Sequence, residues 1–372
     1  MKITGAEATL LFRSPGRPPG TAPSPGGPKR QLCCVVELAT DEGLVGIGVG
    51  DADVRVQIRQ LTSALLERED PRGVTGLWQR MMEARVRSSQ AGLLNHAIAI
   101  LDMALWDLKA KANAEPLWKT LGGSRPKVNV HAGGCELPMS DEELSSWFRI
   151  MALQFGIRGG KLRVGRDPEA DLRRLALMRE VLRERTAEPE LMIDADGCWS
   201  PKEATRRVRE MERQFDLSWV EEPARRWDFL GLRRVSRSIR AAVCAGGNLE
   251  TPAEFLPHLN HRALDVVEVG TRSGGFTGAL QVADAAFGYE LPVALCASVG
   301  NVHAHLGAAL PYCMSMEVVE PVAADGVFAG DVRIEEGWAV AGDRPGHGLV
   351  IDREALARAS IDAVPAGVGG SA

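Results

Sequence analysis

Residues 159–223, GGKLRVGRDPEADLRRLALMREVLRERTAEPELMIDADGCWSPKEATRRVREMERQFDLSWVEEP, contain three short apolar runs and two longer amphipathic stretches. The runs cover residues 160–164, 191–194 and 218–221, and the stretches between them cover residues 167–185 and 201–215. Apolar strands that alternate with amphipathic helices are typical of parallel βα units. This segment therefore predicts an α/β fold built on a parallel sheet.

The same alternation extends outward in both directions. Further apolar runs lie at residues 128–131, 242–245, 265–269, 292–296 and 313–318, and helical stretches separate them. Strands that alternate with helices over this length favour a closed (β/α) barrel, with a doubly wound open sheet as the alternative. We expect the barrel to occupy residues 126–325.

The segments on either side of the barrel have a different character. Residues 1–125 combine strand-like alternation, a hairpin at 31–48 and helical periodicity at 54–67 and 93–111, which predicts a small α+β domain. Its residues 13–30, RSPGRPPGTAPSPGGPKR, form a long Pro/Gly-rich loop, and such loops are either functional lids or disordered. Residues 326–372 return to hairpin-and-turn character, and we expect them to pack back on the N-terminal domain.

Composition excludes several classes of protein. The chain of 372 residues has a formal net charge of −5, so nothing indicates a nucleic-acid surface, and small molecules and further copies of the chain are the expected partners. Its seven cysteines include no C-x-x-C pair, which argues against a disulfide scaffold or a zinc knuckle. Without a signal pattern or a membrane-length apolar run, we expect a cytoplasmic protein with no membrane contact.

Charged side chains end several predicted strands, and in a barrel the carboxyl ends of the strands meet at one mouth. Lys161 and Arg163 end the second strand and share a face, because strand residues alternate. Asp194 ends the third strand and Glu221 the fourth, and their oxygens are the kind that hold Mg²⁺. Glu317 lies on the eighth strand. The side chains of Lys161 and Arg163 face these carboxylates and could bind the carboxylate group of a substrate.

This constellation suits the removal of a proton alpha to a carboxylate. The resulting enediolate carries two negative oxygens, which a divalent metal beside Lys or Arg stabilises. Lys161 can act as the base if neighbouring cations lower its pKa. Arg163 stays protonated in proteins, so we interpret it as a carboxylate clamp or as the group that lowers the pKa of Lys161.

Seven segments together resemble the enolase superfamily, and in particular its mandelate racemase/muconate lactonizing enzyme branch. In chain order they are AILDMALWDLKAKANAEPLWKTLGG (99–123), GGKLRVG (159–165), LMIDADGCWS (191–200), WVEEP (219–223), AGGNLETPAEF (245–255), DVVEVGTRSGGFTGAL (265–280) and GDRPGHGLVID (342–352). The resemblance implies a (β/α)7β barrel, a capping domain formed by both ends of the chain, and a lid at residues 13–30. It also implies a homo-oligomer and Mg²⁺ as the cofactor.

The resemblance implies a role for each residue that matches a family motif. Lys161 matches the first Lys of the K-x-K motif, and Arg163 stands where the second Lys, often the base, is found. Asp194 and Glu221 match two metal ligands. Glu317 matches the acid that hydrogen-bonds the substrate carboxylate.

Two further residues are expected to contact substrate. Asp196 occupies a position beside the substrate that is usually Asn in the family. His131, near the end of the first predicted strand, is the second.

Three family residues are replaced, all on one side of the predicted mouth. The third metal ligand falls at Gly247, the strand-six Asp at Gly270, and the catalytic His at Cys296. Glu250 and Glu268 are candidate replacement ligands, and Cys296 is a candidate acid or base. Whether Mg²⁺ binds without the third family ligand stays open at this point.

Two functions remain after this comparison of motifs. The first is a lyase or isomerase, similar to an acid-sugar dehydratase or a racemase, that abstracts the alpha proton of a small carboxylic acid such as a sugar acid. Because the His-Asp pair is replaced, elimination by one base is favoured over two-base racemisation. The second is an inactive barrel that binds a carboxylate or serves as an assembly partner.

Overall fold

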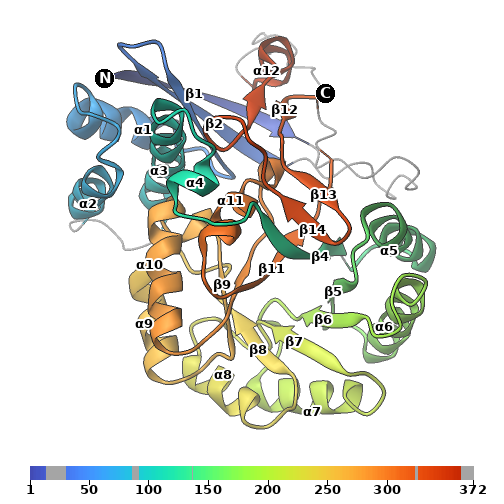
Figure 1. The fold of residues 1–372 in the computed structure, drawn as a ribbon. Coiled ribbons are helices and arrows are strands. Elements are labelled where there is room, and N and C mark those ends of the chain that lie inside the picture. The colour runs from blue at the N-terminus through green and yellow to red at the C-terminus, as the bar shows by residue number, and fades with distance from the viewer. Residues whose placement is uncertain (14–30, 86–91, 136, 323–325, 362–372) are drawn as a thin grey trace, which may run out of the picture.

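The computed structural model describes residues 1–13, 31–85, 92–135, 137–322 and 326–361 (Figure 1). A closed ring of eight parallel strands forms the barrel, in which the last strand pairs with the first through Met316 and Val130. The strands are β4 (Lys127–Cys135), β5 (Gly159–Arg163), β6 (Glu190–Asp194), β7 (Leu217–Glu221), β8 (Ala242–Ala245), β9 (Val266–Val269), β10 (Val293–Leu295) and β11 (Cys313–Val318). The closed ring confirms the predicted barrel over the open sheet.

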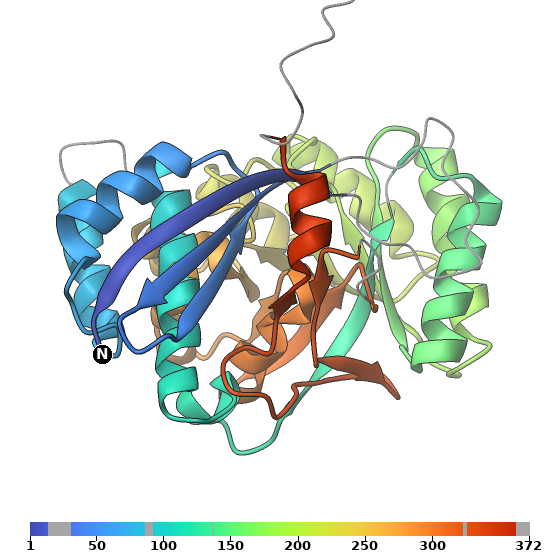
Figure 2. The ribbon, with the colours of Figure 1, turned by 90° about the horizontal axis from the view of Figure 1, so that it is seen from above.

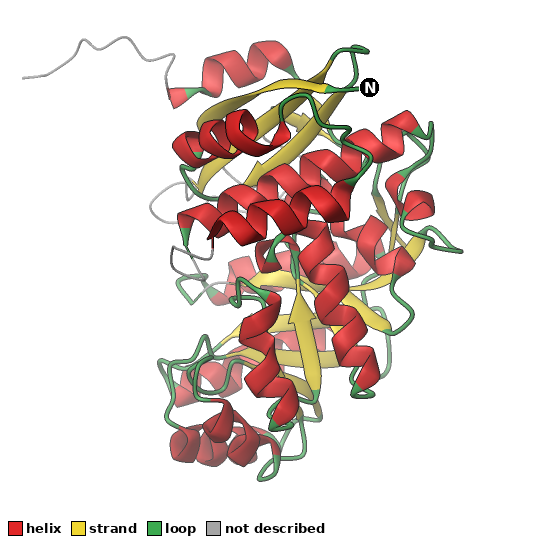
Figure 3. Ribbon diagram, turned by 90° about the vertical axis from the view of Figure 1, so that its left-hand side faces the viewer, coloured by secondary structure: helices red, strands yellow, loops and turns green. Residues whose placement is uncertain are grey.

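Seven helices alternate with these strands, which gives the (β/α)7β order. They are α5 (Asp141–Phe155), α6 (Pro168–Leu182), α7 (Pro201–Met211), α8 (Phe229–Ser236), α9 (Pro252–Asn260), α10 (Gly275–Gly288) and α11 (His303–Ala309). Figure 3 shows the helices packed around the yellow strands. Local sequence fixes several starts: Asp167 and Ser200 accept hydrogen bonds from the first helical N–H groups, and a Pro follows each at the first helical position.

The N-terminal part is an antiparallel sheet covered by helices. The sheet has the order β1 (Ile3–Arg13), β2 (Gln31–Thr40), β3 (Val45–Gly50). Its helices are α1 (Arg55–Leu61), α2 (Val74–Ala84), α3 (Leu93–Ala112) and α4 (Leu117–Thr120). In β3, a Cβ on Gly46 or Gly48 would meet a backbone oxygen of α3 at 2.2 or 2.1 Å. These glycines therefore let α3 pack directly on the sheet, as Figure 2 shows from above.

Helix α3 joins three parts of the molecule. Most of its apolar side chains are buried, and two acids in the helix, Asp102 and Asp107, are also fully buried. Asp102 accepts hydrogen bonds from Thr277 of α10, through Oγ1 at 2.6 Å and the backbone N–H at 2.9 Å. Asp107 accepts from the N–H groups of Ile47 in β3 and His347 in the tail. The cap is thus fixed to the barrel by satisfied buried carboxylates.

The C-terminal part lies against both the barrel and the N-terminal sheet. It contains β12 (Phe328–Ala329), β13 (Arg333–Glu335), β14 (Trp338–Val340), β15 (Val350–Ile351) and α12 (Arg353–Ala359). Strand β14 pairs antiparallel with β4, and Ser360 forms a bridge with Leu11 of β1. The domain boundaries themselves stay a prediction, as does the homo-oligomer. The predicted lid lies, from residue 14 on, outside the described residues.

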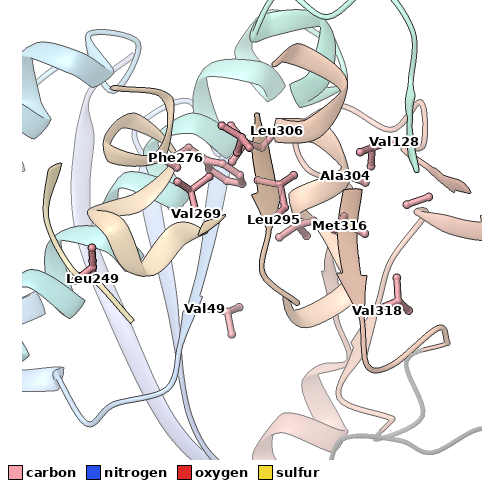
Figure 4. Packing of buried hydrophobic residues seen from close by; sticks show 14 of the residues in the cluster. Val49, Val128, Leu249, Val269, Phe276, Leu295, Ala304, Leu306, Met316 and Val318 are labelled. Atoms are coloured by element: carbon pink, nitrogen blue, oxygen red, sulfur yellow. The ribbon is translucent and has the colours of Figure 1, made fainter. Parts of the chain in front are cut away.

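A continuous hydrophobic core runs through the barrel wall and the cap. Figure 4 shows its part between the last barrel strands and their helices, with Val269, Leu295 and Met316 near Phe276 and Leu306. Full burial of such a side chain contributes about 1.5–3 kcal/mol. Within the described residues, no helix has the length and apolarity needed to cross a membrane.

Candidate active site

A cavity of about 510 Å³ lies between the carboxyl ends of the barrel strands and the cap. Lys161, Glu221 and Glu317 line it from the barrel, and His96 and Ile100 line it from α3. Polar groups that converge in a cavity between two structural units are typical of a small-molecule site. This cavity is therefore the candidate active site.

Lys161 lies at the centre of a group of buried carboxylates. Its ammonium Nζ is 2.5 Å from Glu221 Oε2, 3.3 Å from Glu317 Oε2 and 3.7 Å from Glu268 Oε1. Burial alone would lower the pKa of Lys161, but the carboxylates of Glu221, Glu317 and Glu268 outweigh it and raise the pKa well above 10.5. In this arrangement Lys161 carries its proton at neutral pH.

Arg163 points to a different pair of acids. Its Nη1 is 3.0 Å from Asp194 Oδ2 and 3.2 Å from Asp196 Oδ2. The prediction that Arg163 lowers the pKa of Lys161 is therefore wrong, because two carboxylates neutralise the guanidinium and three others surround the ammonium. The interpretation of Arg163 as a carboxylate clamp stays a prediction.

The site carboxylates differ in their affinity for protons. Burial raises the pKa of Glu221 well above its ordinary value, and the neighbouring Glu268 carboxylate adds to this rise. The pKa of Glu268 and that of Asp194 are also raised, with burial as the main cause in each case. Burial would raise the pKa of Glu317 as well, but Lys161 outweighs burial and lowers it. Glu317 is thus the most acidic member of the group around Lys161.

The side of the mouth with the replaced residues holds no ready base among its described groups. Burial and nearby carboxylates raise the pKa of the Cys296 thiol well above 9.0, so the thiol stays neutral. His303 Nδ1 lies 2.7 Å from the Cys296 carbonyl oxygen, and its Nε2 accepts from the Thr271 N–H at 3.1 Å. Burial lowers the pKa of His303 to about 4. Its imidazole is therefore a neutral structural group that stands beside Gly270.

Two residues predicted to bind substrate lie outside the cavity lining. His131 is buried in the barrel interior, where its ring meets Trp219 edge-on at 5.1 Å and its Nδ1 is 2.8 Å from Ser315 Oγ. Asp196 pairs with Arg163 and its side chain is 60% exposed. Both residues lie near strand ends and were predicted to contact substrate. Their side chains point away from the cavity and do not line it.

Sequence reasoning missed a polar group that the cap contributes. His96 Nδ1 is 3.4 Å from Asp51 Oδ1, and its Nε2 is 3.4 Å from Glu250 Oε1. Arg272, which follows β9, also pairs with Asp51. A hydrogen bond to Asp51 is the main cause that raises the pKa of His96. No strand-end rule identifies these residues, because they meet only when the cap docks on the barrel.

Metal ligands were predicted from the carboxylates. As the side chains lie in the described residues, no three of Asp, Glu, His or Cys are arranged around a common metal position. The chemistry of the donor set nevertheless fits Mg²⁺, because Asp194, Glu221 and Glu268 supply buried carboxylate oxygens that line one cavity. Glu250 is directed elsewhere: its Oε2 accepts from the Gly92 N–H at 2.6 Å, on the cap side.

Comparisons with known proteins agree with this geometry. Residues 145–355 match the enolase C-terminal domain-like family, and residues 13–122 match the mandelate racemase/muconate lactonizing enzyme N-terminal domain. A 3,6-anhydro-alpha-L-galactonate cycloisomerase from Streptomyces coelicolor is 31% identical over 336 residues, which are 88% of this chain and 91% of that protein.

Solved structures are similar over nearly the whole chain. A racemase from Streptomyces coelicolor A3(2) with bound magnesium has a TM-score of 0.84 and 28% identity, over 96% of this chain and 100% of that one. L-Talarate dehydratase from Polaromonas sp. JS666, complexed with Mg and L-glucarate, has a TM-score of 0.82 and 28% identity, over 96% and 97%. The chain therefore belongs to the mandelate racemase/muconate lactonizing enzyme family of the enolase superfamily.

Proposed function

We propose that the protein is a lyase that removes the alpha proton of a small hydroxy acid, of the sugar-acid class, and eliminates water. The observation that carries the proposal is Lys161, which lies among carboxylates at the strand ends, in a cavity between the barrel and the cap. The cycloisomerase and the dehydratase among the relatives support a sugar acid, since their names state such substrates.

Mg²⁺ is the proposed cofactor, held at least by Asp194 and Glu221. When bound, it supplies positive charge for the two oxygens of the enediolate. Glu221 makes the largest carboxylate contribution to the raised pKa of Lys161, so a cation held by Glu221 would lower that pKa toward the range in which a lysine can act as a base. Lys161 then accepts the proton from the alpha carbon. Glu317 and Arg163 are proposed to orient the substrate carboxylate.

The groups across the cavity from Lys161, on the side with the replaced residues, favour elimination over racemisation. Racemisation needs a second acid or base there, but the Cys296 thiol is neutral and the His303 imidazole is neutral and hydrogen-bonded. In the elimination, the C–H electrons form the enol double bond while the β-hydroxyl leaves with a proton as water. A single Lys that has taken the alpha proton can return it to that leaving group.

Deuterium exchange tests this function. The protein is incubated with Mg²⁺ and a panel of sugar acids in D₂O, and mass spectrometry follows dehydration and alpha-deuterium incorporation. Wild type and the control Lys202→Ala, which changes an exposed lysine of α7, should convert the same acid. Folded Lys161→Met should convert none. A wild type that binds an acid without exchange or product would favour the second candidate, an inactive carboxylate-binding barrel.

A further inference from the structure

Gly247 marks the place where the family resemblance puts a third metal ligand. It follows β8 and lines the cavity. Its backbone is not in the left-handed region, so backbone conformation alone does not require a glycine. The surrounding space shows what a side chain at this position would meet.

The Glu268 carboxylate fills that space. A Cβ built on Gly247 would lie 2.4 Å from Glu268 Oε2 and 3.0 Å from Cys296 Sγ. Real Cβ atoms essentially never approach another heavy atom to 2.4 Å. A side chain at position 247 would therefore displace the Glu268 carboxylate, the far end of a flexible side chain, from its observed position.

Strand geometry explains how the neighbouring strand delivers this carboxylate. Strands β8 and β9 are parallel, with Ala245 beside Val267, so Glu268 stands one step beyond the last pair. Val266 packs in the barrel interior, and Glu268 shares its face because strand side chains alternate. The side chain of Glu268 thus points inward at the height of the missing ligand.

Charge and burial also point to a cation here. Glu268 is 4% exposed, and the nearest cation to it, Lys161, is 3.7 Å away and closer to Glu221. Lys161 is surrounded by the carboxylates of Glu221, Glu268 and Glu317, and Arg163 is paired with those of Asp194 and Asp196, so five carboxylates face two cations. A divalent cation would offset much of this excess negative charge, and buried charges require such compensation.

We propose that Glu268 is the third metal ligand of this protein, moved from β8 to β9. The set is then Asp194, Glu221 and Glu268, with Gly247 kept small to make room. This inference deepens the proposed function and rests on it for the identity of the cation. The replaced ligand is thus compensated within the same site.

The test measures Mg²⁺ binding to the metal-free full chain by titration calorimetry, with Mn²⁺ electron paramagnetic resonance as a second readout. Loss of an outer-shell partner weakens metal binding by about 10–100-fold, so Glu268→Gln should weaken it at least tenfold. The matched control Glu250→Gln removes a carboxylate that faces the cap, and its affinity should stay within about twofold of wild type.

A swap of the carboxylate makes the test specific. Glu268→Ala opens the space beside Gly247, so the double variant Gly247→Glu/Glu268→Ala should regain most of the affinity that Glu268→Ala loses. Circular dichroism and thermal melting confirm that each variant is folded. Unchanged Mg²⁺ affinity in Glu268→Gln, loss in Glu250→Gln instead, or a wild type without Mg²⁺ binding would overturn the proposal.

Deuterium exchange separates the two proposals. If Mg²⁺ binding depends on Glu268 but the protein converts no sugar acid, Glu268 remains a metal ligand and the proposed function is contradicted. Conversion by a Glu268→Gln protein with unchanged Mg²⁺ affinity supports the function and contradicts the ligand assignment.

Discussion

Removal of the Lys161 ammonium is expected to destabilise the metal-free protein strongly. Lys161 is 6% exposed and lies within 4 Å of Glu221, Glu268 and Glu317. Loss of one partner from a buried ion pair costs about 3–5 kcal/mol, because the other charge stays buried without compensation. With three carboxylates around one ammonium, we expect Lys161→Met to lower the free energy of unfolding by that amount at neutral pH.

The pH dependence of this loss follows from the pKa shifts. The raised pKa of Lys161 means that its stabilisation is fully present below 10.5 and is lost only as pH rises through the raised folded value. Glu221 and Glu268 also have raised pKa values, so in the folded state they retain protons above 4.5, where the unfolded chain releases them. Their cost to stability therefore grows as pH rises from about 4.5. The deficit of Lys161→Met should be smallest near pH 4.5 and grow toward neutral pH.

Urea unfolding of metal-free protein at several pH values measures the effect. The control is Arg149→Met, which breaks an exposed pair with Glu184 and should cost no more than about 1 kcal/mol. Added Mg²⁺ should recover part of the loss in Lys161→Met, since it restores positive charge among the carboxylates. Equal stability of Lys161→Met and wild type at pH 7 without metal would contradict a stabilising role of the Lys161 ammonium.

Three further predictions concern the cap and the metal. His96→Gln should lower the melting temperature at pH 5.5 more than at pH 8.5, because a pKa raised by Asp51 gives stability that is present below 6.5 and lost as pH rises through the folded value. Melting curves at both pH values check this, and equal losses would contradict it. Thr277→Val removes a hydroxyl that is hydrogen-bonded to Asp102 Oδ1 at 2.6 Å and to Trp106 Nε1 at 2.9 Å. We expect the free energy of unfolding, measured with urea, to fall by about 1–3 kcal/mol for each buried group that loses its partner. Mg²⁺ at about 100 times its Kd should raise the free energy of unfolding of wild type by about 2.7 kcal/mol, and excess EDTA should reverse the gain.

The sequence predicted the barrel well because its signals are local. Each apolar run between amphipathic stretches corresponds to a strand of the ring, and Asp or Ser before Pro marks helix starts such as those at Pro168 and Pro201. Helix α2 was not predicted, although its buried residues Val74, Leu77, Trp78 and Met81 recur at helical spacing. The role of α3 as the central support was also missed, because buried acids such as Asp102 read as surface residues in a sequence.

The candidate site was predictable only as far as the strand ends. The barrel brings Lys161, Glu221 and Glu317 together, as expected from strands that end at one mouth. The partner of each charge depends on side-chain direction, so the pairing of Arg163 with Asp194 could not be predicted. The sequence predicted Glu268 and Glu250 as alternative replacement ligands, but the contact of Glu268 with the space beside Gly247 depends on the register of β8 and β9, which one sequence does not reveal.

A crystal structure with Mn²⁺, located by its anomalous scattering, would show directly which carboxylates bind the metal. We expect one peak in the cavity at direct coordination distance, about 2.0–2.2 Å, from carboxylate oxygens of Asp194, Glu221 and Glu268. A peak that contacts Asp194 and Glu221 while Glu268 stays on Lys161, or a cavity without a peak at saturating Mn²⁺, would contradict it.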